Sequence, residues 1–450
     1  MPSQPLLDFC NFLADRNSDK IPPPVLHHAK IVLLDTLGVI LRGSLVPEVL
    51  EIARELGACK LEAGVTCPGH PGFFAPPLAA MLNGMAGSSL EFEEGNSRAM
   101  GHPAIQLVPA LVAAAEEQGS SGGRLLIGLI CGYEGASRIS RASMMRKGLH
   151  PTGTWGVVGS ALGVGCLRKR KPEDLVAIAN IASSYVFSPF VKNSFVGKNV
   201  ASTFAGFVNQ AGYLSNLFFD KGIRADEGCL EMTFSQFVSE RFDPHGLLVG
   251  LGEEYAIAEN YFKPYPTCRF THPALDALEG ILLENKISPE DVAKVSVSSF
   301  KAAVHTSTKP PANVEAMRFS VPYLIAARLC RGPINLGTLD HDIVLDPQVR
   351  DLAGRVEMSL SQEYEQMRPV RNPAKVTLHL RDGHELTREV MNCTGDPLKP
   401  MTQEALVRKF LDLATPVLGK NEAEDFVEKF ETLESVDNVK PLMRMLRARA

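Results

Sequence analysis

The chain has 450 residues, of which 45% are hydrophobic and 22% charged, and its 46 basic and 51 acidic side chains give a net charge of −5. This length predicts two domains, and the balanced charge excludes a general nucleic-acid binder, which needs a concentrated positive surface. Nine scattered cysteines without a CxxC pair exclude a zinc ribbon and a disulfide framework, and they indicate a reducing compartment.

Apolar residues recur at helical spacing through most of the first 220 residues. Alanine and glycine are frequent on the inner faces, which predicts closely packed helices in a compact bundle. The basic run at 168–171 is interpreted as a solvated turn between helices rather than a nuclear signal. The predicted helices cover residues 25–41, 48–56, 75–90, 105–117, 124–142, 157–166, 175–186 and 200–218.

The pattern changes after about residue 262. Strands are predicted at 292–300, 374–380 and 385–390, and Arg381-Asp382-Gly383 is a hairpin signal between the last two. Helices at 274–284, 321–329 and 347–356 accompany them, and helices at 404–413, 422–432 and 440–446 follow. We therefore predict a mostly α protein with a helical domain over 1–265, an α+β domain over 266–398, and C-terminal helices over 399–450 that return to the helical domain.

Two polar segments stand where apolar helices end. The loop 147–156 contains His150 and feeds the N-terminus of a buried helix, so His150 either handles a carboxylate or a proton or caps a helix inside the core. Glu91, Glu93 and Glu94 precede Gly101-His102-Pro103. This cluster is either a metal site, an acid/base site or a charged helix end.

Two further segments carry cations. Lys192 and Lys198 lie in a loop flanked by apolar helices, where they either bind an anion or are solvated. Lys263, Cys268 and Arg269 lie in a proline-stiffened segment at the predicted domain junction, which is either part of an active site or a linker. Because HExxH, GxGxxG and GxxxxGK[ST] motifs are absent, we expect chemistry by lysine, histidine and carboxylate side chains without a metal or cofactor.

Taken in order along the chain, these segments resemble the MmgE/PrpD family. The resemblance implies a large all-helical domain built from both chain ends, a smaller α+β lid domain, and a homodimer. It also implies metal-free enzymes of small di- and tricarboxylates, such as 2-methylcitrate dehydratase, cis-aconitate decarboxylase and iminodisuccinate epimerase. The matching pieces are Ile21-Pro22, Leu34-Asp35-Thr36-Leu37-Gly38-Val39, Leu90-Glu91-Phe92-Glu93-Glu94, His102-Pro103, Gly132-Tyr133-Glu134, His150-Pro151-Thr152-Gly153-Thr154, Lys263-Pro264-Tyr265-Pro266, Cys268-Arg269, His272-Pro273, Phe319-Ser320-Val321-Pro322-Tyr323 and Lys399-Pro400-Met401-Thr402.

The family's functional positions carry over unevenly. His102, His150, Lys192 and Lys263 match them, and Cys268 lies where another member has a His. The chain departs from the family in its acidic segment, where each Asp is replaced by Glu and the Thr by Gly95, and the stretch up to His102 is about one residue longer than in some members. After Lys192, Asn193-Ser194-Phe195 replaces the family's Pro-x-His. The resemblance implies catalytic roles for His102, His150, Lys192 and Lys263, and substrate binding by Glu91, Thr152, Cys268 and Arg269.

We predict a carbon–oxygen lyase that abstracts a proton next to a carboxylate and dehydrates a 2-methylcitrate- or alkylcitrate-like acid, with His102 and His150 as base and acid because imidazole titrates near neutral pH. The alternatives are an epimerase of the iminodisuccinate type, a decarboxylase of the cis-aconitate type, and a non-catalytic relative that binds an anion or a partner. No apolar run reaches the roughly 18 residues of a spanning helix. We expect no membrane or nucleic-acid partner and a cytoplasmic location, with a mitochondrial one left open.

Overall fold

The computed structural model describes residues 3–57, 63–187, 189–307 and 309–448. The chain divides into two compact units. The first unit comprises residues 1–191, 201–260 and 402–450, and the second comprises 192–200 and 261–401. The predicted domain boundaries lie within five residues of this division at both ends of the second unit, but residues 192–200, assigned to the helical domain from the sequence, belong to the second unit.

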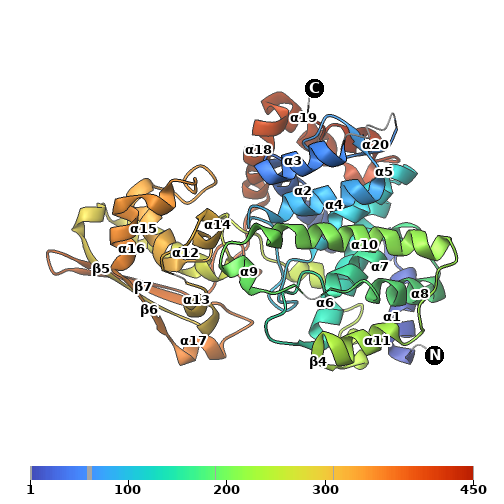
Figure 1. Ribbon diagram of the computed structural model, residues 1–450, viewed down its shortest axis with the longest axis horizontal. Coiled ribbons are helices and arrows are strands. Elements are labelled where there is room, and N and C mark those ends of the chain that lie inside the picture. Colours follow the sequence, from blue (N-terminus) through green and yellow to red (C-terminus); the bar gives the residue numbers. More distant parts are fainter. Residues whose placement is uncertain (1–2, 58–62, 188, 308, 449–450) are drawn as a thin grey trace. The chain divides into compact units, whose positions relative to one another are not determined.

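The first unit is built mainly of helices contributed by both ends of the chain (Figure 1). Several of them begin with proline in the first turn, where the missing N–H group has no helical partner in any case. The mostly α fold class is confirmed, and helix α1 is an addition to the prediction. The helices are α1 (Gln4–Ala14), α2 (Pro23–Gly43), α3 (Pro47–Leu56), α4 (Pro76–Ser88), α5 (Val108–Gln118), α6 (Gly122–Arg141), α7 (Trp155–Leu167), α8 (Pro172–Ser183), α10 (Ser202–Asp220), α11 (Cys229–Met232), α18 (Gln403–Leu418), α19 (Lys420–Phe430) and α20 (Lys440–Arg444).

Glycines allow α6 and α7 to approach each other closely. A Cβ atom on Gly163 would lie 2.9 Å from the carbonyl oxygen of Gly128, and one on Gly132 would lie 3.0 Å from that of Gly159. No side chain larger than hydrogen fits these positions without moving a backbone. The small residues that the sequence places on the helix faces therefore set the distance between α6 and α7. Helix α7 is the one that follows the His150 loop.

Helix α2 corrects the expectation that no apolar segment reaches membrane-spanning length. In the described part of the chain, it is the one helix that passes that test of length and composition. Most of it is buried inside the first unit, and its buried face includes the carboxylate of Asp35. These features are typical of the core helix of a folded domain.

Two short antiparallel strand pairs complete the first unit. Strand β1 (Val65–Thr66) pairs antiparallel with β2 (Phe73–Phe74). Strand β3 (Ser143–Met145) pairs antiparallel with β4 (Ser239–Phe242), just before the loop that carries His150. The second pairing ties the end of α6 to a segment almost 100 residues later in the chain.

The second unit contains a four-stranded sheet in the order β6-β5-β7-β8 (Figure 1). Alternate residues of the central strands, including Val295, Val297, Val376 and Leu378, are buried, as the period-2 pattern predicts. Strand β5 pairs parallel with β6 and antiparallel with β7, and β7 pairs antiparallel with β8. The elements are α9 (Lys192–Phe195), α12 (His272–Glu284), β5 (Val292–Ser299), α13 (Lys301–Thr306), α14 (Val314–Met317), α15 (Val321–Arg331), α16 (Pro347–Gly354), β6 (Val356–Leu360), α17 (Gln362–Gln366), β7 (Ala374–Leu380) and β8 (Glu385–Val390).

Strand β6 differs from the prediction, which extends a helix to residue 356. Helix α16 ends at Gly354, and the chain then enters the sheet beside β5. Only Val356 in this strand is fully buried, because β6 lies at the edge of the sheet. Its alternation is therefore too weak to be read from the sequence.

Candidate active site

His102 lies in the loop between α4 and α5, and the backbone of that loop holds its ring. The nitrogen Nδ1 lies 2.7 Å from the carbonyl oxygen of Glu94. A carbonyl oxygen can only accept a hydrogen bond, so Nδ1 donates and carries a proton. In the neutral ring Nε2 is therefore the basic nitrogen. The carboxylate of Glu93 lies 3.8 Å from Nδ1 and favours a positive charge on the ring.

The ring of His150 is held in the opposite tautomer. The backbone N–H of Thr152 donates to Nδ1 over 3.1 Å, so the proton of the neutral ring is on Nε2. Burial lowers the pKa of His150 to about 4, although the carboxylate of Glu91 acts in the opposite direction. At that pKa the ring is neutral at pH 7, which does not fit the expectation that this imidazole titrates near neutral pH. Its Nε2–H group is a hydrogen-bond donor.

The loops that carry the two histidines contact each other at Gly101. A Cβ atom on Gly101 would lie 2.6 Å from Cζ2 of Trp155 and 3.3 Å from Cβ of Pro151. Gly101 directly precedes His102, and Pro151 directly follows His150. The first unit therefore brings the two predicted catalytic histidines into neighbouring segments.

Glu91 and Thr152, both predicted to bind substrate, border these histidines. Glu91 has φ of 52°, a left-handed backbone conformation that is rare outside glycine, and Met100 in the same loop has the same φ. Such strain persists only where the surrounding structure imposes it, and it is common at functional sites. Thr152 is buried, and its backbone N–H orients the ring of His150.

The acidic segment beside His102 is open to two chemical interpretations from the sequence, a metal site or an acid/base site. Among residues 3–57, 63–187, 189–307 and 309–448, no group of three or more His, Cys, Asp and Glu residues is arranged to hold a metal ion. Glu93 and Glu94 instead approach the histidine ring, one through its carboxylate and one through its carbonyl oxygen. This arrangement favours the acid/base interpretation.

Lys263, Cys268 and Arg269 lie in the second unit, and all three are buried. Arg269 has an internal partner, because its Nη2 lies 2.5 Å from Oδ1 of Asp396 and its guanidinium stacks 4.5 Å above the ring of Tyr261. The charge of Arg269 is thus balanced within the unit, which assigns it a structural contact in addition to the predicted contact with substrate.

Lys192 begins the short helix α9 of the second unit and is exposed. Its segment is anchored to helix α14: the side-chain amide of Asn313 donates to the carbonyl oxygen of Gly197 over 2.8 Å. The rings of Phe195 and Phe319 pack edge to face 5.5 Å apart. The eight predicted residues therefore fall into two groups of four, with Glu91, His102, His150 and Thr152 in the first unit and Lys192, Lys263, Cys268 and Arg269 in the second.

Sequence analysis missed Lys409, a buried cation beneath the His102 loop. Its Nζ lies 2.8 Å from Oδ1 of Asp35, donates to the carbonyl oxygen of Phe92 over 3.0 Å, and lies 4.1 Å from the centre of the Phe92 ring. A signal was present, since Lys409 falls between Leu406 and Leu413 on the apolar face of α18. A charged residue on such a face requires a buried partner.

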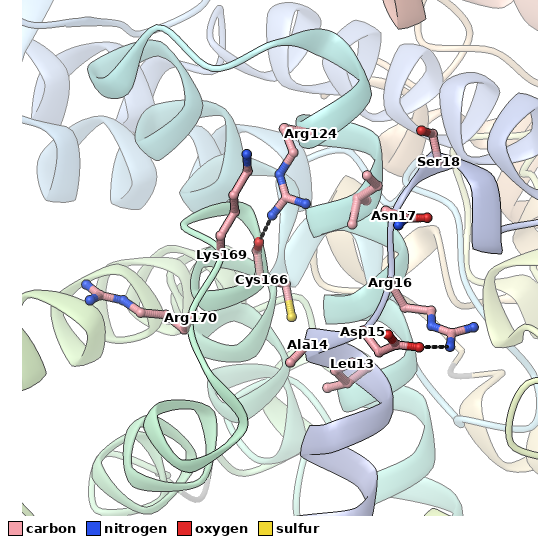
Figure 2. A pocket seen from close by; sticks show the side chains of 11 residues that line it. Leu13, Ala14, Asp15, Arg16, Asn17, Ser18, Arg124, Cys166, Lys169 and Arg170 are labelled. Atoms are coloured by element: carbon pink, nitrogen blue, oxygen red, sulfur yellow. Dashed lines mark hydrogen bonds and ion pairs between the residues drawn. The ribbon is translucent and has the colours of Figure 1, made fainter.

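A cavity of about 440 Å³ lies elsewhere in the first unit, between the end of α1 and the start of α6 (Figure 2). None of the predicted site residues lines it. Three of the cations at this cavity have partners in the protein. Arg124 donates to the carbonyl oxygens of Cys166 and Leu167 at the end of α7, Arg16 pairs with Asp15, and Arg170, whose side chain extends away from the other two (Figure 2), pairs with Asp220. The bonds from Arg124 cap the end of α7, where carbonyl groups attract positive charge.

Family comparisons match both parts of the chain. A family model described as the MmgE/PrpD N-terminal domain matches residues 7–245, and one described as the MmgE/PrpD C-terminal domain matches residues 265–435.

Curated relatives match over nearly the whole length. A protein named cis-aconitate decarboxylase from Aspergillus terreus is 25% identical over 468 aligned positions, which cover 98% of this chain and 95% of the relative. Proteins of the same name from Homo sapiens and Mus musculus are 26% and 24% identical, and each comparison covers 94% of this chain. The similarity thus spans both units and the C-terminal helices.

Proposed function

The chain belongs to the MmgE/PrpD family, and from this premise we propose that it is a lyase that decarboxylates a small tricarboxylate of the cis-aconitate type. Three relatives with that printed activity align over at least 94% of the chain, which supports the proposal. They favour the decarboxylase alternative over the main prediction from sequence, dehydration of a 2-methylcitrate- or alkylcitrate-like acid. The observation that carries the proposed mechanism is the opposite polarity of the two imidazole rings, whose loops contact each other at Gly101.

His102 is proposed as the proton carrier. When the bond between carbon and the departing carboxylate breaks, its electron pair moves into the carbon framework, and another carbon of the substrate takes up a proton. An imidazolium at His102 can donate that proton from Nε2, because Nδ1 remains bound to the carbonyl oxygen of Glu94. The nearby carboxylate of Glu93 stabilises the charged ring before transfer.

His150 is proposed as a neutral hydrogen-bond donor. Because its pKa is lowered to about 4, the ring is uncharged at neutral pH and has no extra proton to give to the substrate. Its Nε2–H group can bind a substrate carboxylate or the negative charge that develops as carbon dioxide leaves. A neutral imidazole is suited to this role because it stabilises the charge without protonating it.

Lys192 and Lys263 are proposed to bind the remaining carboxylates, with Glu91, Thr152 and Cys268 shaping the substrate pocket and Arg269 supporting the segment that carries Lys263. Lysine pairs strongly with a carboxylate where water is excluded. The two lysines belong to the second unit and the two histidines to the first.

The test is proton and carbon NMR of the EDTA-treated protein in deuterium oxide. The substrates are cis-aconitate, citrate, 2-methylcitrate, a longer alkylcitrate and iminodisuccinate. We expect cis-aconitate to lose carbon dioxide and gain one deuterium, and we expect His102→Ala to abolish the reaction. Loss of water from a citrate would establish the dehydratase, and deuterium uptake by iminodisuccinate with inversion would establish the epimerase.

If neither His102→Ala nor Lys192→Ala changes the protein's function in its host, the result would instead favour a non-catalytic relative. Such a relative would bind the same acids without turnover, which isothermal titration calorimetry detects. This outcome would contradict the proposed activity while leaving the family assignment intact.

We also propose that the protein is a homodimer in a reducing compartment such as the cytoplasm. Phe207 on α10 is 50% exposed and Phe237 is 68% exposed in the first unit, and exposed aromatic side chains are enriched at interfaces. The eight cysteines in the described part of the chain are all free thiols. Light scattering after size-exclusion chromatography gives the mass, and a mass near 49 kDa would contradict the dimer.

A further inference from the structure

We infer that Glu94 is a positioning residue that holds His102 in place by binding both the ring of His102 and the backbone two residues after it. The inference deepens the proposed function and rests on it for the role of His102. Glu94 lies in the acidic run beside His102, but no role follows for it from the sequence. The structure assigns it contacts to His102, Ala104 and Tyr133.

Two atoms of Glu94 bind His102 and the chain that follows it. Its carbonyl oxygen accepts the proton of Nδ1 over 2.7 Å, which fixes the tautomer of the ring. Its carboxylate oxygen Oε1 accepts the backbone N–H of Ala104 over 2.8 Å. Ala104 follows His102 by two residues. The carbonyl group of Glu94 therefore constrains the ring of His102, and the side chain of Glu94 constrains the backbone just after it. Few rotations of His102 remain that preserve both bonds.

The other carboxylate oxygen is anchored in the core. Oε2 of Glu94 accepts the hydroxyl of Tyr133 over 2.8 Å, and both side chains are fully buried. Tyr133 lies on α6, which the glycine contacts fix against α7. His102 is thereby linked, through Glu94 and Tyr133, to the closely packed helices α6 and α7. Burial raises the pKa of Glu94 to about 7.

Other charged and titratable groups also lie around Glu94 and affect its pKa. Neighbouring negative charge opposes ionisation of Glu94, whereas hydrogen-bond donors favour it. The groups are Asp35 of α2 with its partner Lys409 of α18, Tyr133 of α6, Asn260 with its partner His28 of α2, and the adjacent Glu93 and His102.

Two substitutions separate positioning from folding. Glu94→Asp keeps the charge but shortens the side chain by one methylene, so it cannot reach both Ala104 and Tyr133. Glu94→Gln keeps the length and the oxygen that accepts from Ala104 but removes the charge. Glu116→Gln is the matched control, because Glu116 is also fully buried and accepts one backbone N–H and one hydroxyl, both from Thr66, over 2.7 and 2.9 Å.

The kinetic readout is the pH profile of kcat and KM for the acid that the wild type converts. A displacement of reacting groups by about 1 Å can cost on the order of 100-fold, so we expect Glu94→Asp to lower kcat by about that factor with little change in KM. We expect Glu94→Gln to retain more activity and to move the limb of the profile due to His102 to lower pH, because a nearby negative charge is lost. Glu116→Gln should leave kcat, KM and the profile unchanged. A Glu94→Asp variant with wild-type kcat, or a Glu94→Gln profile identical to that of the wild type, would overturn the inference.

A second readout needs no substrate and so distinguishes failure of this inference from failure of the proposed function. Imidazole ¹⁵N NMR of the full-length protein reports which nitrogen of His102 carries the proton. We expect a single Nδ1–H tautomer in the wild type and Glu116→Gln, and a mixture in Glu94→Asp. A wild type that converts none of the acids but shows this pattern would sink the proposed reaction and keep the positioning role. An unchanged tautomer in Glu94→Asp would refute the positioning role even in an active enzyme.

Discussion

Lys409→Met should sharply destabilise the first unit. The substitution keeps an unbranched side chain of similar size on the apolar face of α18 but removes the ammonium group. Asp35, which is fully buried, then loses a partner that lies 2.8 Å away. The carbonyl oxygen of Phe92 also loses its 3.0 Å donor, which loosens the loop that carries Glu91 and His102.

The size of the effect follows from burial. The side chain of Lys409 is only 6% exposed and that of Asp35 is not exposed at all. Removing one member of a buried ion pair costs about 3–5 kcal/mol, mainly because it leaves an uncompensated charge. Taking about 4 kcal/mol, the unfolding equilibrium constant should rise by about a thousandfold.

Urea unfolding followed by tryptophan fluorescence measures this cost. Trp155 is the only tryptophan of the chain and is fully buried in α7, so its emission reports the first unit rather than the second. Lys429→Met is the matched control, because Lys429 and Asp425 are similarly close, at 2.7 Å, but are 55% and 48% exposed. An exposed pair of this kind contributes at most about 1 kcal/mol.

A double variant identifies the cause. Asp35→Leu combined with Lys409→Met replaces the buried pair with apolar groups, which is often neutral or stabilising. We expect it to recover most of the stability that Lys409→Met alone loses. A cost below about 1 kcal/mol for Lys409→Met, or a double variant no more stable than the single one, would refute the reasoning that buried charge dominates here.

Three further predictions concern the same unit. Gly163→Ala places a methyl group 2.9 Å from the carbonyl oxygen of Gly128 and should cost about 1–3 kcal/mol in the same urea assay; an unchanged midpoint would contradict it. Because the pKa of His150 is lowered from its ordinary value of 6.5 to about 4, the unfolded chain binds a proton there before the folded one does. Stability of the first unit should fall as pH drops from about 6.5 to about 4, and His150→Gln should flatten that slope in urea titrations at several pH values. Gly101→Ala collides with the ring of Trp155 and should shift its emission and lower kcat/KM; wild-type values for both would disprove the contact between the two histidine loops.

The helices and the hairpin could be predicted because their signals are local. In β7, Val376 and Leu378 point to one buried face, and Gly383, with φ of 92°, lies in the turn between β7 and β8. A residue and its neighbours carry all of that information. Strand β6 could not be predicted in the same way, because it is specified by pairing with β5 more than 50 residues earlier rather than by its own pattern.

The same distinction applies to the candidate site. His102 and His150 could be named from loop composition and from the resemblance to the family. Their tautomers could not, because each depends on which backbone group approaches Nδ1, a carbonyl oxygen for His102 and an N–H for His150. The buried partners of Glu94 and Lys409 are likewise separated from them by tens or hundreds of residues. Sequence can mark such a charge as unusual, but the fold determines what balances it.

Two departures of this chain from the family pattern meet at one contact. The acidic segment has Glu where the family has Asp, and the stretch from there to His102 is about one residue longer than in some members. The carboxylate of Glu94 spans that stretch to the N–H of Ala104 while it also reaches Tyr133. The longer side chain of glutamate thus makes two contacts at once in this chain, one to the backbone N–H of the His102 loop and one to the core hydroxyl of Tyr133.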